Sequence, residues 1–182
     1  AAYADEENGE WKFLQWDRND GRPKMPMGSS GHRWQQGKGQ WNLLPKDGKD
    51  GSAIDAELSF LEQHDDVVQV AFDDFGGARA VKRGVPVRKI TTADGAVVLA
   101  ATVYDVLMAQ YGVPRGLAGD YPQDYDEDAV YTPAWAERYT GMDRQTLVRF
   151  AREWATTAHH TGGKCTVIIG AVPSPLDAGA IV

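Results

Sequence analysis

The sequence predicts an α/β fold: part of an open parallel or mixed sheet with flanking helices, preceded by an irregular, strand-rich N-terminal section. Two helix patterns and an apolar run follow one another between residues 131 and 171. A helix that leads into a buried strand is half of a β–α–β crossover, the unit from which open parallel sheets are built. Shorter apolar segments earlier in the chain predict the strands of the irregular section.

Clear start and stop signals mark the two helices. Thr132 caps the first, and Pro133 takes the first helical position, where its missing N–H is not needed. Gly141 ends that helix, because glycine adopts the left-handed conformation at the lowest cost. Asp143 caps the second helix, and Gly162 ends it. Helical spacing predicts one buried stripe along the second helix: Leu147, Ala151, Trp154, Ala155 and Ala158.

The apolar run at residues 165–169 predicts a strand that is covered on both faces. In open α/β sheets, ligands bind beyond the carboxyl ends of the strands. Gly170 and Ala171 occupy that position, and small residues there let a ligand approach the backbone closely. We therefore take these two as candidate binding residues, with a glycine turn after a core strand as the structural alternative.

The middle of the chain predicts further strands and a hairpin. Residues 57–72 alternate loosely between apolar and polar, as half-buried strands do. An Asp94-Gly95 pair stands between apolar-rich runs at residues 85–92 and 96–101. Asp-Gly is a strong signal for a two-residue hairpin turn, so these runs are expected to pair.

A short helix is expected next, and then an acidic loop. Thr102 and Asp105 approach a capping box, which predicts a helix start, and Gly112 ends the pattern. Residues 114–128 are rich in Asp, Gly and Pro. They lack the central glycine and the ligand spacing of a calcium loop, and a proline interrupts them, so they predict a solvated loop.

Residues 1–50 contain four of the six tryptophans, Trp11, Trp16, Trp34 and Trp41. An aromatic surface for single-stranded nucleic acid also needs an excess of positive charge, which this section lacks. The pattern therefore favours short strands and ordered loops anchored by buried tryptophan. Residues 12–16 and 41–44 are the expected strands.

Composition restricts the function. The net charge of −7 disfavours nucleic acid and anionic membranes as partners. A single cysteine, Cys165, excludes an internal disulfide and a cysteine-ligated cluster or zinc site built by this chain alone. No apolar run approaches the roughly 20 residues that span a bilayer, and no signal peptide is present, so a membrane location would come through a partner. The chain begins without methionine, and we expect it to be a piece of something longer.

Common catalytic motifs are not found. Gly37-Lys38 and Gly163-Lys164 both fail the phosphate-loop pattern, because the first lacks the following Ser or Thr and the second precedes its strand. His159 and His160 are adjacent on a helix and project roughly 100° apart, so they cannot face one metal ion. Contact with the carbonyl groups of the helix C-terminus is the expected role of these two. No grouping of Ser, His and Asp can be defended from spacing.

Several stretches resemble one enzyme family. Y-T-P-A-W-A-E-R-Y-T-G from Tyr131, A-R-E-W-A from Ala151 and T-G-G-K-C-T-V-I-I-G-A from Thr161 resemble the dimethyl sulfoxide reductase superfamily of molybdenum enzymes. W-K-F-L-Q-W at Trp11, G-S-S-G-H-R-W at Gly28 and T-V-Y-D-V-L-M-A-Q-Y-G from Thr102 resemble, within it, the catalytic alpha subunit of respiratory membrane-bound nitrate reductase. The resemblance covers roughly the first 171 residues and a small interior part of that subunit.

The resemblance implies a function for the parent protein. It implies a bis-molybdopterin guanine dinucleotide cofactor and an iron–sulfur cluster, whose ligands lie upstream of this chain, so no catalytic or metal-binding residue is assigned here. Gly170 and Ala171 are expected to face one guanine nucleotide arm of the cofactor. The parent would reduce nitrate to nitrite with electrons from an iron–sulfur beta subunit, and a membrane cytochrome gamma subunit would hold it at the cytoplasmic face of the membrane. The isolated fragment is expected to be inactive and marginally folded.

The same reasoning divides the chain into four segments. Residues 1–84 form the irregular insert region, and residues 85–130 the hairpin, helix and acidic loop. Residues 131–171 form the helix-helix-strand unit of the cofactor-binding domain. Residues 172–182 depart from the family pattern, since V-P-S-P replaces its glycine-asparagine loop, and we hypothesise that they are not native to the family.

Two alternatives to the nitrate reductase hypothesis stay open. One is a non-catalytic scaffold fragment that binds a partner protein through the aromatic N-terminal section. The other is a different member of the superfamily, such as a formate or selenate enzyme. The reading frame on both sides would separate them, because an upstream cysteine cluster favours the enzyme.

Overall fold

The computed structural model describes residues 14–26, 45–73 and 80–167. The chain divides into two compact units, Ala1–Gln123 and Asp124–Val182. The described part of the first unit contains two three-stranded sheets and one helix, and that of the second contains two helices. This confirms the predicted mixed α/β class with open sheets. All strand pairs in the described ranges are antiparallel, so the expected parallel pairing is not among them.

The smaller sheet of the first unit has the strand order β2-β1-β3. β1 runs Gln15–Asp17, β2 runs Arg22–Lys24, and β3 runs Ala56–Glu57. β1 overlaps the strand predicted at residues 12–16, of which 12 and 13 lie outside the described ranges. The strand predicted at 41–44 lies wholly outside them.

A buried lysine holds the turn between β1 and β2. Lys24 Nζ lies 2.7 Å from Oδ2 of Asp17 and 2.7 Å from Oδ2 of Asp20. Burial raises the pKa of Asp17, but hydrogen bonds from Lys24 and from the backbone N–H groups of Asp55 and Asn19 outweigh it and keep the pKa below its usual value. Hydrogen bonds to the two carboxylates raise the pKa of Lys24, so the cluster is charged at neutral pH.

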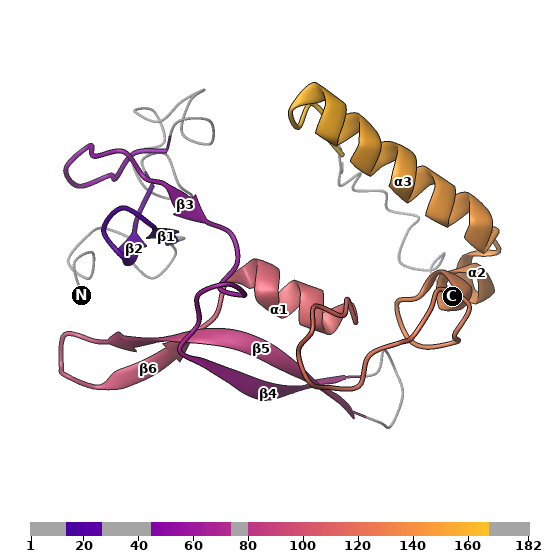
Figure 1. The fold of residues 1–182 in the computed structure, drawn as a ribbon, viewed down its shortest axis with the longest axis horizontal. Coiled ribbons are helices and arrows are strands. Elements are labelled where there is room, and N and C mark those ends of the chain that lie inside the picture. The colour runs from indigo at the N-terminus through magenta and orange to yellow at the C-terminus, as the bar shows by residue number, and fades with distance from the viewer. Residues whose placement is uncertain (1–13, 27–44, 74–79, 168–182) are drawn as a thin grey trace, which may run out of the picture. The chain divides into compact units, whose positions relative to one another are not determined.

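The larger sheet has the order β4-β5-β6. β4 runs Asp66–Asp73, β5 runs Ala80–Thr91, and β6 runs Val97–Ala100 (Figure 1). The middle of β5 forms part of the core of this unit, with Val85 and Val87 buried. β4 confirms the later of the strands predicted within residues 57–72, whereas residues 58–65, with Leu58 and Phe60, are in no strand.

The hairpin predicted at Asp94-Gly95 is also present. Gly95 has φ of 85°, a left-handed conformation that glycine adopts without a side-chain clash. The backbone N–H of Thr92 donates to the carbonyl oxygen of Ala96 at 2.8 Å and closes the turn. β5 and β6 are therefore paired as the Asp-Gly signal predicts, but residues 93–95 form a three-residue loop and not a two-residue turn.

Helix α1 (Val103–Gln110) begins at the predicted capping pair. Thr102 Oγ1 accepts a hydrogen bond from the backbone N–H of Asp105 at 2.9 Å and donates to Asp105 Oδ2 at 2.8 Å. Gly112, which has φ of 70°, follows the last turn as predicted. The helix thus starts and stops where its sequence dictates.

Buried Arg83 of β5 joins the larger sheet to the end of α1. Its Nη1 donates to the carbonyl oxygens of Ala109 and Gln110 at 2.9 and 2.8 Å, two of the last four carbonyls of the helix. The Ala109 carbonyl also accepts from the backbone N–H of Gly112 at 3.1 Å. Its Nε donates to the carbonyl oxygen of Asp120 at 2.7 Å. α1 packs against β5 and lies alongside the sheet (Figure 1).

The second unit consists, in its described part, of α2 (Pro133–Thr140) and α3 (Arg144–Thr161), joined by a short turn. The residues that bound the helices are those predicted: Thr132, Gly141, Asp143 and Gly162. Arg144 Nε donates to Glu137 Oε2 at 2.6 Å, and its Nη1 donates to Asp126 Oδ1 at 3.0 Å. This arginine ties the start of α3 to α2 and to the preceding acidic loop.

The predicted buried stripe of α3 is wrong for this chain. No residue of α3 is buried, and the stripe residues are half-buried or exposed. The apolar residues do recur at helical spacing, but the eight-residue helix α2 is too short to cover the 18-residue helix α3. A stripe that the sequence marks as apolar therefore stays uncovered within the described residues.

The strand predicted at 165–169 is not observed where it can be tested. Residues 165–167 are in no strand, and 168 and 169 lie outside the described ranges. A strand needs a neighbour for its backbone hydrogen bonds, and no described strand pairs with this segment. In residues 14–26, 45–73 and 80–167, no helix has both the length and the hydropathy needed to cross a bilayer.

Candidate functional site

The two residues predicted to bind a cofactor, Gly170 and Ala171, lie outside the described residues. Their role therefore stays a prediction, as does the divergence of residues 172–182. Cys165, close before them, is half-buried, and its Sγ lies 3.9 Å from the carbonyl oxygen of Trp154.

A groove of about 670 Å³ opens in the first unit. Its walls come from β1, β3, β5, α1 and the segments that follow β3 and α1. The aromatic and charged side chains that line it include Trp16, Glu57, Glu62, Arg88, Tyr104 and Arg115. This combination of aromatic rings and opposite charges makes it the strongest candidate site in the described part of the first unit.

Arg88 of β5 is held from several directions within this groove. Its guanidinium lies 4.6 Å from the ring centroids of both Trp16 and Phe60, close enough for cation–π attraction. Its Nη2 donates to Glu57 Oε1 at 2.9 Å, and its Nε donates to the carbonyl oxygen of Gln63 at 2.8 Å. The arginine therefore joins the two sheets and the loop after β3.

Arg115 is anchored in the same wall by a buried carboxylate. Its Nη1 donates to Asp105 Oδ1 at 2.6 Å and lies 3.3 Å from Ser59 Oγ. The side chain of Asp105 is fully buried and that of Arg115 is 13% exposed. Asp105 also accepts hydrogen bonds from the Ser59 hydroxyl at 2.6 Å and from the backbone N–H of Phe60 at 2.8 Å.

These hydrogen bonds set the charge state of Asp105. Burial raises the pKa of its carboxyl, but the hydrogen bonds from Ser59, the Phe60 backbone, Arg115 and Thr102 together outweigh burial and lower the pKa below its usual value. Asp105 is thus a carboxylate at neutral pH, paired with a cation. Such a group acts as an anchor and not as a proton donor.

The charged side chains of the groove therefore have a structural role. Arg88 pairs with Glu57 and Arg115 pairs with Asp105, so both guanidinium groups already contact carboxylates of this chain. Sequence reasoning identified Asp105 only as a helix cap and did not identify either arginine. No local spacing reveals these pairs, because Arg88 and Glu57 are 31 residues apart.

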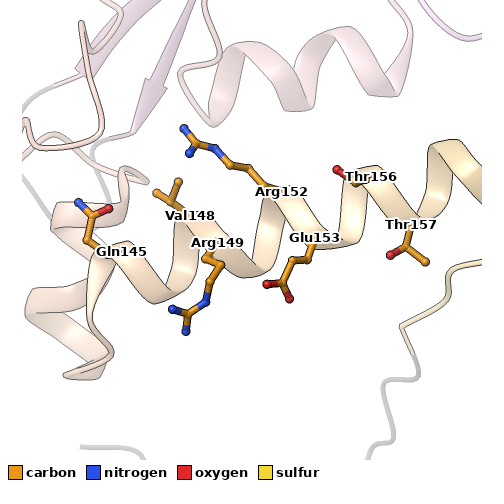
Figure 2. Close-up of a pocket in the computed structure, with 7 residues that line it drawn as sticks. All are labelled: Gln145, Val148, Arg149, Arg152, Glu153, Thr156 and Thr157. Atoms are coloured by element: carbon orange, nitrogen blue, oxygen red, sulfur yellow. The ribbon is translucent and has the colours of Figure 1, made fainter.

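A second hollow lies along α3 in the second unit. It measures about 610 Å³ and is lined by seven residues that all belong to that helix (Figure 2). Figure 2 shows Arg149 and Glu153 on one side of the helix and Arg152 on the other. A single helix does not enclose a ligand, so this hollow is the open flank of α3.

The described side chains do not gather in a way that would hold a metal ion or cluster by themselves. An iron–sulfur cluster, or a metal ion held by protein side chains alone, needs several Cys, His or carboxylate ligands around one point. No three such side chains come together in residues 14–26, 45–73 and 80–167. The rings of His159 and His160 lie 5.8 Å apart at the exposed end of α3, and Asp126 and Asp128 pair with arginines. The described residues do not fit a metal or cluster site, and no redox step is assigned to them.

Comparison with known proteins places the chain in a family. No protein-family model matches it. Respiratory nitrate reductase 1 alpha chain of Escherichia coli K12 is 39% identical over 182 aligned residues, 93% of this chain. Respiratory nitrate reductase 2 alpha chain of the same organism is 40% identical over 90% of the chain, and nitrate reductase alpha chain of Bacillus subtilis 168 is 34% identical over 89%.

These relatives are much longer proteins. The chain spans 14% of the length of each Escherichia coli relative and 13% of the Bacillus subtilis relative. The similarity therefore runs through nearly all of this chain and through a limited segment of theirs. The chain belongs to the nitrate reductase alpha chain family and corresponds to one segment of those proteins.

Proposed function

We propose that the chain is a segment of the molybdenum-dependent catalytic subunit of a respiratory nitrate reductase, a protein that reduces nitrate to nitrite. The observation that carries the proposal is identity of 39% and 40% to two respiratory nitrate reductase alpha chains over 93% and 90% of this chain. Because the similarity extends over nearly the whole chain, it supports common descent of the entire segment with the nitrate reductase alpha chains, and not the sharing of one short motif.

Within that subunit the segment acts as a packing element. Its buried charges are paired with one another around the groove and at the β1–β2 turn, so they stabilise the fold and leave the reaction to other parts of the protein. Gly170 and Ala171 would approach one guanine nucleotide arm of a bis-molybdopterin guanine dinucleotide. When bound, that cofactor supplies the molybdenum that accepts oxygen from nitrate.

The family resemblance supplies the setting. Electrons would come from a quinol-linked iron–sulfur beta subunit, and a cytochrome gamma subunit would hold the enzyme at the cytoplasmic face of the membrane. An iron–sulfur cluster of the alpha subunit would be ligated outside this segment. The isolated 182-residue chain would then be inactive.

A segment exchange tests this proposal. In Escherichia coli nitrate reductase 1, the matching segment of the alpha chain would be replaced by this chain, and nitrite production would be measured in a strain without other nitrate reductases. The matched control carries the Bacillus subtilis segment, which is 34% identical to this chain. We expect both hybrids to reduce nitrate and the isolated chain not to. An active control beside an inactive hybrid that retains molybdenum would contradict the proposal.

The cofactor contact is tested separately. Gly170→Val in the hybrid places a branched side chain where the nucleotide arm would approach, so the molybdenum content should fall. Ala171→Gly is the control, because it keeps the position small and should preserve the content. Equal molybdenum in Gly170→Val and the unmodified hybrid would remove the assignment.

A further inference from the structure

Helix α1 is apolar on nearly every side. Its sequence, V-Y-D-V-L-M-A-Q, contains one charged residue, Asp105. That residue is fully buried and points to the network with Arg115 and Ser59. The side of the helix away from Asp105 therefore carries no charge.

The outer face of α1, defined by Val103, Tyr104, Val106 and Leu107, is open among the described residues. Tyr104 lies where this face borders the groove, with the Arg115 guanidinium 5.8 Å from the centroid of its ring. Val103 is 73% exposed, and the other three are 36–37% exposed. On the inner side, Asp105 and Ala109 are 0% and 1% exposed. Helices of globular proteins normally present polar residues to solvent, and a helix that is hydrophobic all round is a buried one.

We propose that the outer face of α1 docks against another stretch of the same alpha-subunit polypeptide, outside these 182 residues. This inference rests on the proposed function. The Escherichia coli relatives extend far beyond the aligned segment, which is 14% of their length, so ample polypeptide exists to cover the face.

The size of the face favours a covering from the same polypeptide. An eight-residue helix is about 12 Å long, and a stable interface between separate proteins buries about 800 Å² on each partner. By themselves, four partly exposed side chains on so short a helix supply less than that area. Two parts of one chain need no such area, because their covalent connection keeps their effective concentration high. The occupant should itself be apolar, since α1 offers it no charge to pair.

Photo-crosslinking in the full-length subunit tests the docking. A benzoylphenylalanine is placed at position 107 of the hybrid alpha subunit, and a matched control places it at position 93, in the exposed hairpin turn. We expect position 107, and not position 93, to crosslink to a peptide outside the segment. A crosslink to a second copy, to a partner subunit or only within the segment would overturn the inference, as would no crosslink at position 107.

A second measurement needs no substitution. Hydroxyl-radical oxidation of Tyr104 in the purified alpha subunit, relative to the denatured subunit, should be slowed about as much as that of buried Phe60. Oxidation of Tyr104 clearly faster than that of Phe60 would overturn the inference, because Tyr104 is 36% exposed without a covering segment and Phe60 is 3% exposed. Nitrate reduction by the same sample distinguishes failure of the docking from failure of the proposed function. An active subunit with an exposed Tyr104 counts against the docking alone. An inactive subunit with a protected Tyr104 counts against the proposed function alone.

Discussion

Arg115 and Asp105 form an ion pair of 2.6 Å in which the carboxylate is fully buried. The pair joins the segment after α1 to the first turn of that helix, and Asp105 also binds Ser59 and the backbone of Phe60. One carboxylate thus joins the first turn of α1 to the segment after that helix and to Ser59 and Phe60, which are 46 and 45 residues away in sequence. Its removal should therefore affect the first unit as a whole.

Asp105→Asn should destabilise the 182-residue chain by about 3 kcal/mol, because it leaves the Arg115 cation without its buried partner. The free energy of unfolding is measured by urea denaturation. Asp66→Asn serves as the control, since Asp66 is exposed and, in the described contacts, its carboxylate accepts only from the backbone N–H of Val67. A loss no larger than that of the control would show that the pair contributes little.

Because its pKa is lowered in the folded state, Asp105 should also make the chain less stable in acid. The folded state holds the pKa of Asp105 below the ordinary aspartate value of 3.8, so the unfolded chain binds more protons between the two values. The stabilisation is therefore present above pH 3.8 and is lost as the pH falls through the folded pKa. Urea midpoints measured between pH 7 and pH 2 should decline below that value, and less steeply in Asp105→Asn. An equal decline in both proteins would assign the acid sensitivity to other carboxylates, such as Asp17.

Gly119→Ala should destabilise the chain by more than the usual glycine substitution. Gly119 has φ of 152°, and an added Cβ would lie 2.7 Å from Arg83 Cα and 2.8 Å from the Lys82 carbonyl oxygen. Gly116 also has a positive φ, of 79°, but a Cβ there meets nothing within 4 Å. Gly116→Ala should lower the free energy of unfolding by about 1 kcal/mol through backbone strain alone. Gly119→Ala should lower it clearly more, because the steric clash adds to the strain. Equal thermal unfolding midpoints for the two variants would contradict this.

Local signals in the sequence were sufficient for the helices and the hairpin. Thr102, Thr132 and Asp143 cap helices as predicted, and Gly95 turns the hairpin. These predictions hold because each depends on hydrogen bonds within a few residues. No longer-range knowledge of the fold is needed to make them.

Features that depend on distant parts of the chain were not predictable in the same way. Arg88 contacts Trp16, Glu57 and Phe60, and no spacing in the sequence reveals such a cluster. The stripe of α3 shows the reverse case, in which an apolar pattern is present but its cover is not among the described residues. A periodic pattern indicates that a face will be buried, but it does not say which segment buries it.

Leu99→Lys should reduce self-association of the isolated chain. Among the described strands β6 pairs only with β5, and Val97, Val98 and Leu99 are 63%, 43% and 51% exposed. An open edge with exposed apolar residues is a template for strand pairing between molecules, and a lysine there disfavours it. Ala93→Lys adds the same charge in the neighbouring turn, outside the strand. The chain carries a net charge of −7, so either lysine reduces the charge repulsion between molecules by the same amount. If the β6 edge drives association, Leu99→Lys should therefore scatter less light than Ala93→Lys. Equal scattering by the two variants would show that the β6 edge does not drive association.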